Sequence, residues 1–216
     1  MNKVIKNGLL PLPRDPRDFS FGAVFKLPDL KELPDEFITA KPLKIKDQKN
    51  SDLCTAYALT AVSEDQEGIE LNPEYQFAKI KQIMGDYESW GADLRSACKS
   101  AVKFGSLEEK FVNSIGLPQN PRNWNNWNTE LDKEAEKHKK QSYFKIDGPY
   151  DTFDNIRVVM WLNRDKKQSI LTGIKWRHSW THARHGIIPK EISEETGVGH
   201  AFKIFGWKQI NGEPYL

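Results

Sequence analysis

Residues 48–58 read QKNSDLCTAYA, which places a glutamine six positions before Cys54. Apolar residues then recur at helical spacing up to a closing glycine, so the sequence predicts a helix over residues 51–68. Ser51 or Asp52 is expected to cap that helix by accepting a hydrogen bond from a free backbone amide. Cys54 then lies in the first turn, where the positive end of the helix dipole stabilises a thiolate. The pattern predicts a nucleophilic cysteine at a helix start.

A histidine far downstream can serve as the partner of this cysteine. Residues 199–207 read GHAFKIFGW, which predicts a strand over residues 200–208 that begins at His200. Asn211-Gly212 then predicts a hairpin turn. A histidine at the start of such a strand can pair with Cys54 across an interface between two lobes.

The remaining patterns divide the chain into two parts. Helices are expected over residues 73–84, 92–104, 129–140 and 151–163. A strand is expected over residues 168–176, followed by a long polar insertion over residues 177–198. These elements predict a mainly helical lobe over residues 46–140 and a β-rich lobe over residues 141–216.

These features resemble the papain-like cysteine peptidases. The resemblance rests on Gln48, on Cys54 with the four residues after it, on residues 90–97 (WGADLRSA) and on residues 199–207. They follow one another in the family's order over roughly residues 43–216. The resemblance implies an α+β fold with a papain-like two-lobe architecture, made of a helical lobe and an antiparallel β-barrel-like lobe that is incomplete in this sequence. It implies no cofactor and no metal.

The resemblance also assigns a role to each matching residue. Cys54 would attack a peptide carbonyl and form a thioester, so the implied activity is that of a cysteine endopeptidase with a polypeptide substrate. His200 would form an ion pair with the thiolate and later protonate the leaving amine. Gln48 and the backbone N–H of Cys54 would form the oxyanion hole. A further set of residues would bind the substrate: Gly91, Ala92, Asp93, Leu94 and Gly199.

The sequence departs from the family at several places. Ser51 stands where the family usually has a cysteine that forms a disulfide bridge. The asparagine that orients the histidine, in an Asn-Ser-Trp-Gly stretch, is expected a few residues beyond Leu216, because Asn211 belongs to the predicted turn. The strands that close the β lobe are also missing, which leaves three alternatives: the sequence is a truncated or processed form, another segment or chain completes the lobe, or the lobe is unusual. Loss of the orienting residue weakens catalysis without necessarily abolishing it.

Residues 1–45 take the place of the family's helical propeptide. Six prolines fix φ and remove amide donors, so this stretch is expected to be an extended strap and neither a helix nor a central strand. Residues 14–19 (RDPRDF) resemble the short leader of some bacterial and viral members. We expect the strap to cross the body of the protein or to plug the substrate-binding site.

The composition excludes several classes of function. Lys and Arg number 32 and Asp and Glu number 30 among 216 residues, so the net charge of +2 does not favour a nucleic acid or an anionic membrane as partner. No apolar stretch is long enough to span a bilayer, and the N-terminus carries no secretion signal. The two cysteines exclude a disulfide scaffold, so a reducing location in the cytoplasm or in a virus particle is expected.

Two alternatives keep this fold and change the function. The chain could be a structural or binding module that retains the site without the chemistry, which the missing asparagine favours. It could also be an acyl-transfer or deamidating relative, because nucleophiles other than water can resolve a thioester.

Two further sets of residues admit a second interpretation. Cys98 falls on the apolar face of its helix and is expected to pack in the core. His178, His182 and His185 have the spacing of zinc ligands on one helix face, but they lie between predicted strands with no accompanying carboxylates. A polar loop is the favoured interpretation of these histidines.

Overall fold

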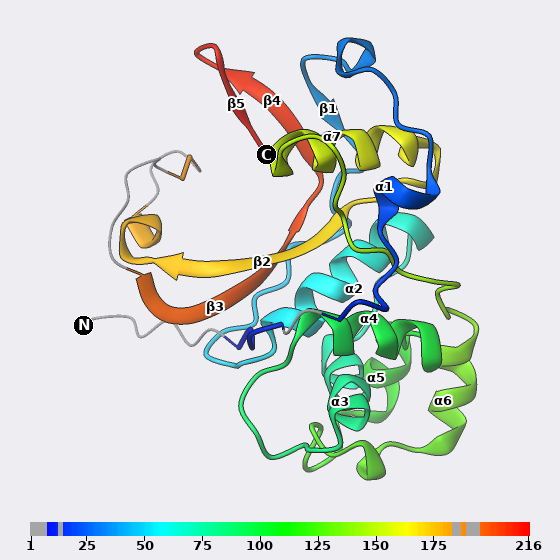
Figure 1. Cartoon of the computed structure of the whole chain (residues 1–216). Helices are drawn as coiled ribbons and strands as arrows, with labels where there is room; N and C mark the ends of the chain where they lie inside the picture. The colour runs from blue at the N-terminus through cyan, green and yellow to red at the C-terminus, as the bar shows by residue number, and fades with distance from the viewer. Residues whose placement is uncertain (1–7, 13–14, 183–186, 189–194) are drawn as a thin grey trace.

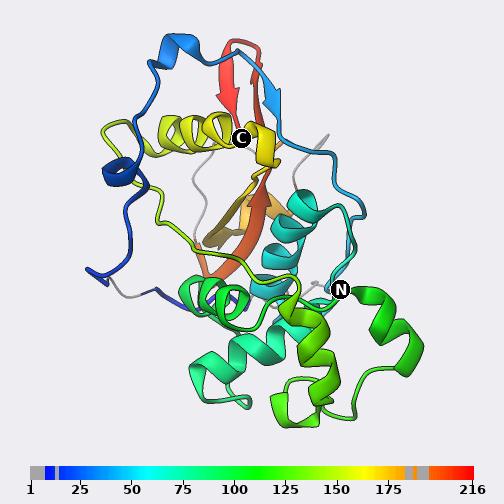
Figure 2. The same cartoon turned by 90° about the vertical axis from the view of Figure 1, so that its right-hand side faces the viewer.

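The computed structural model describes residues 8–12, 15–182, 187–188 and 195–216. Figure 1 shows two halves on either side of the helix α2 (Cys54–Glu67). One half gathers the helices α3 (Pro73–Met84), α4 (Leu94–Lys103), α5 (Glu109–Ile115) and α6 (Thr129–Glu136). The other half holds α7 (Thr152–Leu162) and the strands, as Figure 2 shows from a second side. The predicted α+β class is confirmed.

Local capping sets the bounds of the helices that were predicted well. Asn72 accepts a hydrogen bond of 2.7 Å from the Tyr75 N–H, and Pro73 occupies the first helical position of α3. Asp93 caps α4 in the same way, through the Ser96 N–H at 2.9 Å. The predicted helix over residues 73–84 is therefore confirmed, and the helix predicted from residue 92 begins two residues later.

The start of α2 differs from the prediction. Neither Ser51 nor Asp52 caps it: the N-cap residue is Leu53, and within the described chain no side chain caps this end. The Asp52 carboxylate accepts instead from the Gly91 N–H and from Arg122, so it is not available to the helix. The amides of the first turn are left without a side-chain acceptor.

A long two-stranded ribbon carries the histidine. The strand β2 (Ile170–Arg177) pairs antiparallel with β3 (Glu195–Ile204), and Ile174 lies opposite His200. The prediction of a strand beginning at residue 200 is wrong, because β3 begins at Glu195, inside the expected polar insertion. His200 consequently lies in the middle of a ladder that holds its backbone.

A second, smaller sheet forms the far end of the same half. It has the order β1 (Phe37–Ile38), β4 (Gly206–Ile210) and β5 (Glu213–Tyr215), all antiparallel. The expected turn between the last two strands is confirmed, with φ of 53° at Asn211 and 77° at Gly212. The described strands form two separate sheets, so the expected barrel-like closure is not present among them.

The two halves are joined through α2. On one side Ala56 and Leu59 pack with Phe77 and Ile80 of α3 in a buried cluster. On the other side β3 packs along α2, and Lys203 donates to the Asp65 carboxylate at 2.8 Å. This ion pair is largely shielded from solvent, since the Asp65 side chain is 1% exposed. The joint therefore fixes β3 relative to the helix that begins at Cys54.

The strap is extended for most of its described length, but it is not free of regular structure. It contains the short helix α1 (Phe21–Val24), the 3-10 turn η1 (Leu30–Glu32) and the edge strand β1. Figure 2 shows it running along both halves of the molecule. The expectation of no helix is wrong for one turn, in which Phe21 stacks on Phe25 with ring centroids 4.3 Å apart.

Other differences from the prediction concern one helix end, one additional helix and short 3-10 turns. The helix expected over residues 129–140 stops at Glu136, and α5 was not predicted. Three more 3-10 turns are η2 (Trp124–Asn126), η3 (Arg164–Lys166) and η4 (His178–His182). None of the described helices combines the length and the apolar character needed to cross a membrane.

Candidate active site

Cys54 lies at the junction of the two halves. It is 1% exposed and forms one buried cluster with Ala58 of α2 and Ala201 of β3. Ala201 follows His200 directly, so the strand that carries the histidine lies against the start of the helix that carries the cysteine. The structure thus brings the elements that hold the two predicted catalytic residues together.

The His200 ring is held by packing. The Trp176 ring on β2 meets it edge to face, with centroids 5.2 Å apart. Its Nδ1 atom is buried, and among the described residues it has no hydrogen-bond partner. Burial lowers the pKa of His200 below its usual value, because desolvation disfavours the charged ring.

The lowered pKa of His200 predicts how this group changes the free energy of unfolding with pH. In the full chain, the ring is expected to titrate below the ordinary value of 6.5, as followed by the NMR shift of its Cε1 proton against pH. The unfolded chain then binds more protons than the folded one as pH falls through 6.5, so this group lowers the free energy of unfolding in acid. The same resonance in denaturant provides the reference. A folded-state midpoint at or above that reference would contradict the prediction.

Gln48 lies in a tight loop just before α2. Its Nε2 donates to the Ser51 carbonyl at 3.0 Å, and the Ser51 hydroxyl donates back to the Gln48 carbonyl at 2.6 Å. One of the two Nε2 hydrogens is engaged in this loop, which leaves the other for a different acceptor. The loop therefore holds the glutamine amide close to the uncapped start of α2, where the Cys54 N–H lies.

The residues expected to bind substrate instead bind the chain's own strap. The Ala92 N–H donates to the Gly8 carbonyl at 2.7 Å, and the Leu10 N–H donates to the Ala92 carbonyl at 3.0 Å. On the opposite side the Leu9 N–H donates to the Gly199 carbonyl at 3.1 Å. An extended peptide backbone is thus bound from two sides, by the helical half and by β3.

The Leu9 side chain lies against the cysteine cluster. It packs there together with Leu94 and Leu171. A Cβ added at Gly173 would collide with a Leu9 methyl group, and one at Gly199 would lie 3.1 Å from it. Two glycines on neighbouring strands therefore make the room for this side chain.

The other two predicted substrate residues differ in what they do. Leu94 packs against the Cys54 cluster. The Asp93 carboxylate receives the Ser96 N–H and hydroxyl as the cap of α4, at 2.9 and 2.6 Å. The Asp93 carboxylate thus caps α4.

Sequence reasoning missed two residues that fix the site. Thr55 donates from its hydroxyl to the Ala92 carbonyl at 3.0 Å, and Asp52 accepts from the Gly91 N–H at 2.6 Å. Both flank Cys54 closely in sequence, and that proximity was the available signal. Their partners lie about forty residues downstream, so no local pattern could have identified them.

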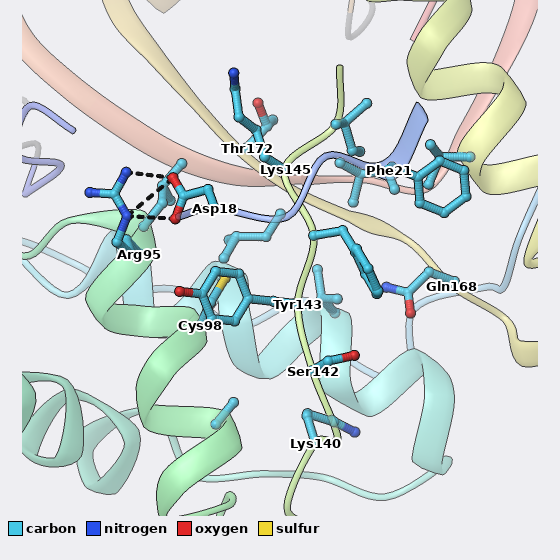
Figure 3. Close-up of a pocket in the computed structure, with 18 of the residues that line it drawn as sticks. Asp18, Phe21, Arg95, Cys98, Lys140, Ser142, Tyr143, Lys145, Gln168 and Thr172 are labelled. Atoms are coloured by element: carbon cyan, nitrogen blue, oxygen red, sulfur yellow. Dashed lines mark hydrogen bonds and ion pairs between the residues drawn. The ribbon is translucent and has the colours of Figure 1, made fainter. Parts of the chain in front are cut away.

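Cys98 belongs to a different place. A cavity of about 990 Å³ lies between the strap, α4 and the segment 140–147, and Figure 3 shows Cys98 and Tyr143 in its lining. The Asp18–Arg95 ion pair, at 2.6 Å, lies at the same cavity. Cys98 is half-buried there, so the expectation of a core residue is only partly met.

The structure describes only part of the group of histidines that was considered for zinc. Within the residues that the structure describes, no group of three His, Cys, Asp or Glu side chains is placed to hold a metal ion. His178 lies in η4, and His185 is outside the described residues.

The arrangement of these elements is the fold of papain-like cysteine proteases. The structure is similar to that of xylellain, a cysteine protease from Xylella fastidiosa, with a TM-score of 0.71 and 20% identity over 94% of this chain and 80% of that one. It is also similar to procathepsin B S9 from Trypanosoma congolense, with a TM-score of 0.70 and 15% identity over 97% of this chain and 73% of that one.

A third similar structure is the digestive procathepsin L 3 of Tenebrio molitor larval midgut. Its TM-score is 0.66 and its identity 12%, over 92% of this chain and 64% of that one. No protein-family model matches the sequence, and a search of the curated proteins found no match. At these identities the likeness establishes the fold alone.

Proposed function

We propose that this chain is a thiol peptidase that hydrolyses peptide bonds through a thioester on Cys54. One observation carries the proposal: an extended backbone, that of residues 8–10, is bound by Ala92 and Gly199 directly beside the cysteine. A polypeptide substrate offers the same N–H and C=O groups and can make the same pairs. The site therefore recognises peptide main chain next to a thiol.

Each step of the reaction has a group that can perform it. The Cys54 thiol gives its proton to the His200 ring as its sulfur adds to the scissile carbonyl carbon, and the oxyanion is stabilised by the Cys54 N–H and the free hydrogen of Gln48 Nε2. His200 transfers its proton to the leaving amine as the C–N bond breaks. Water, deprotonated by His200, then attacks the thioester, and His200 returns this proton to the sulfur as the C–S bond breaks, which releases the acid and restores the thiol.

The place of Leu9 supports a further property of the substrate. The apolar side chains of Leu94, Leu171 and Ala201 surround it, and they offer no charge to a polar residue. A branched aliphatic side chain is therefore expected at the corresponding position of a substrate, because its burial contributes about 1.5–3 kcal/mol.

Irreversible labelling tests the proposal. The native chain is treated with a peptidyl epoxide that carries leucine, and the adduct is located by peptide mapping and mass spectrometry. A single adduct is expected on Cys54, formed at a much lower rate by the His200→Ala variant. The same labelling is repeated on the Leu9→Glu variant, in which the strap is expected to leave the site. If neither folded protein forms an adduct, the result would favour a binding module without chemistry.

A further inference from the structure

A buried carboxylate lies two residues before the nucleophile and reaches across to the peptide-binding backbone. The Asp52 side chain is 3% exposed. Its Oδ2 atom accepts from the Gly91 N–H at 2.6 Å and from Arg122 Nη2 at 2.9 Å. Asp52 lies two residues before Cys54. The hydrogen bond to its carboxylate therefore ties the Gly91 backbone to the start of α2.

Arg122 connects the same carboxylate to the segment before Gly91. It comes from the loop that follows α5, and its Nη2 also donates to the Ser89 carbonyl at 2.7 Å. Its guanidinium lies over the ring of Phe77, 5.2 Å from the centroid, and this ring is fully buried. Arg122 thus ties the Ser89 carbonyl to the carboxylate that binds the Gly91 N–H.

A second cation binds the same segment from α3. Lys81 is 0% exposed, and its Nζ donates to the Ser89 hydroxyl at 2.7 Å and to the Gly91 carbonyl at 2.9 Å. Burying an ammonium group is unfavourable unless it is well hydrogen-bonded, so these two bonds account for its position. Gly91 is therefore bound at its N–H by an anion and at its C=O by a cation.

Gly91, which these groups hold, is followed by Ala92, whose backbone pairs with the strap. Gly91 has φ of +69°, and a Cβ there would collide with the Gly8 carbonyl of the strap. Ala92 comes next and presents both its N–H and its C=O to the strap. We call Asp52, Arg122 and Lys81 the charge clamp, because their charges fix the backbone that comes just before Ala92.

We infer that the charge clamp consists of positioning residues for peptide binding: it sets the place of the Ala92 backbone relative to Cys54. The inference rests on the proposed function for its consequence in catalysis, and its geometry is independent of that function. The clamp touches neither the reacting sulfur nor the histidine. Its loss is therefore expected to weaken the capture of peptide and to leave the intrinsic reactivity of the thiol unchanged.

The test compares two reagents on one cysteine. All proteins are full-length and carry Leu9→Glu, so that the strap does not compete with the peptide. Arg122→Gln is compared with Arg164→Gln, a matched change at an exposed arginine far from the site. Rates of Cys54 alkylation are measured with a leucine-containing peptidyl epoxide and with iodoacetamide, and thermal melts verify folding.

The expected result is selective. Arg122→Gln should lower the rate with the peptidyl epoxide about 10-fold or more, because displacement of a binding group by about an ångström has effects of that order. The rate with iodoacetamide should stay within about twofold of the Arg164→Gln control. Lys81→Met, which removes the other cation, should show the same selective loss.

Two outcomes would overturn the inference. Equal epoxide rates in the Arg122→Gln and Arg164→Gln proteins would show that the clamp does not position the peptide. Parallel losses with both reagents would show that it only supports the fold.

A third measurement separates failure of the clamp from failure of the proposed function. If the Leu9→Glu protein reacts no faster with the peptidyl epoxide than with iodoacetamide, the proposed function fails. Hydrogen exchange at the Gly91 amide then tests the charge clamp independently. Faster exchange at Gly91 in Arg122→Gln than in Arg164→Gln, with α2 amides unchanged, supports the clamp. Unchanged exchange at Gly91 refutes it.

Discussion

Cys54→Ala is expected to remove peptide hydrolysis, with a fall in kcat on the order of 10⁶-fold. Cys54 supplies the atom that forms the thioester, and alanine has no group that can add to a carbonyl. The effect should appear in kcat, with KM little changed, since the backbone pairs at Ala92 and Gly199 do not involve the sulfur. The measurement is steady-state cleavage of a fluorogenic peptide with leucine before the scissile residue.

The second cysteine of the chain provides the matched control for this variant. Cys98 lines the large cavity, and burial, with the nearby Asp93 and Asp18 carboxylates, raises the pKa of its thiol to about 12. Near neutral pH that thiol stays protonated and is a poor nucleophile. Cys98→Ala should therefore keep kcat within about twofold of the native value. Loss of activity in Cys98→Ala, or its survival in Cys54→Ala, would contradict the assigned nucleophile.

The parts of the fold that the sequence predicted well are those decided by neighbouring residues. The bounds of α3 follow from Asn72 before Pro73 and from Gly85 after the last turn, which adopts φ of 76°. The hairpin at Asn211-Gly212 follows from the same kind of local signal. The short stretch around Cys54 likewise indicated a helix start, and α2 begins at that residue. His200 was expected at the start of a strand and lies inside β3.

What the sequence could not predict depends on partners far away in the chain. Asp52 before a helix is a good cap by local rules, but Arg122, seventy residues later, and the Gly91 amide bind its carboxylate instead. The start of β3 was missed because residues 195–199 include two glycines, which weaken a strand pattern, and this stretch pairs with β2. The roles of Lys81 and Thr55 became visible only when Gly91 and Ala92 were placed beside them.

Leu9→Glu is expected to raise kcat/KM in the full chain, on the proposal that the strap occupies the site of the substrate. The Leu9 backbone uses the carbonyl of Gly199, and the side chain packs with the Cys54 cluster, so substrate and strap cannot bind there together. A carboxylate in this apolar place would lose its hydration without gaining a partner. The variant strap should therefore leave the site.

The expected size of the effect follows from the contacts that the strap makes. Burial of one leucine side chain contributes about 1.5–3 kcal/mol, and each backbone hydrogen bond contributes about 0.5–1.5 kcal/mol. Ordering the strap offsets part of this sum. A net bias of about 3 kcal/mol corresponds to an increase in kcat/KM of about 10²-fold.

A neighbouring leucine of the strap separates plugging from a general effect of added charge. Leu12 is 46% exposed, so Leu12→Glu adds the same carboxylate to the same strap without entering the Cys54 cluster. Gly8→Ala should act like Leu9→Glu, because a Cβ at Gly8 would collide with the Asp52 carbonyl. A rise in kcat/KM for Leu9→Glu and Gly8→Ala, with no rise for Leu12→Glu, would establish that the strap blocks the site. Equal activity in all three variants and the native chain would show that the strap is only a structural support, since substrate would then reach Cys54 with Leu9 still in place.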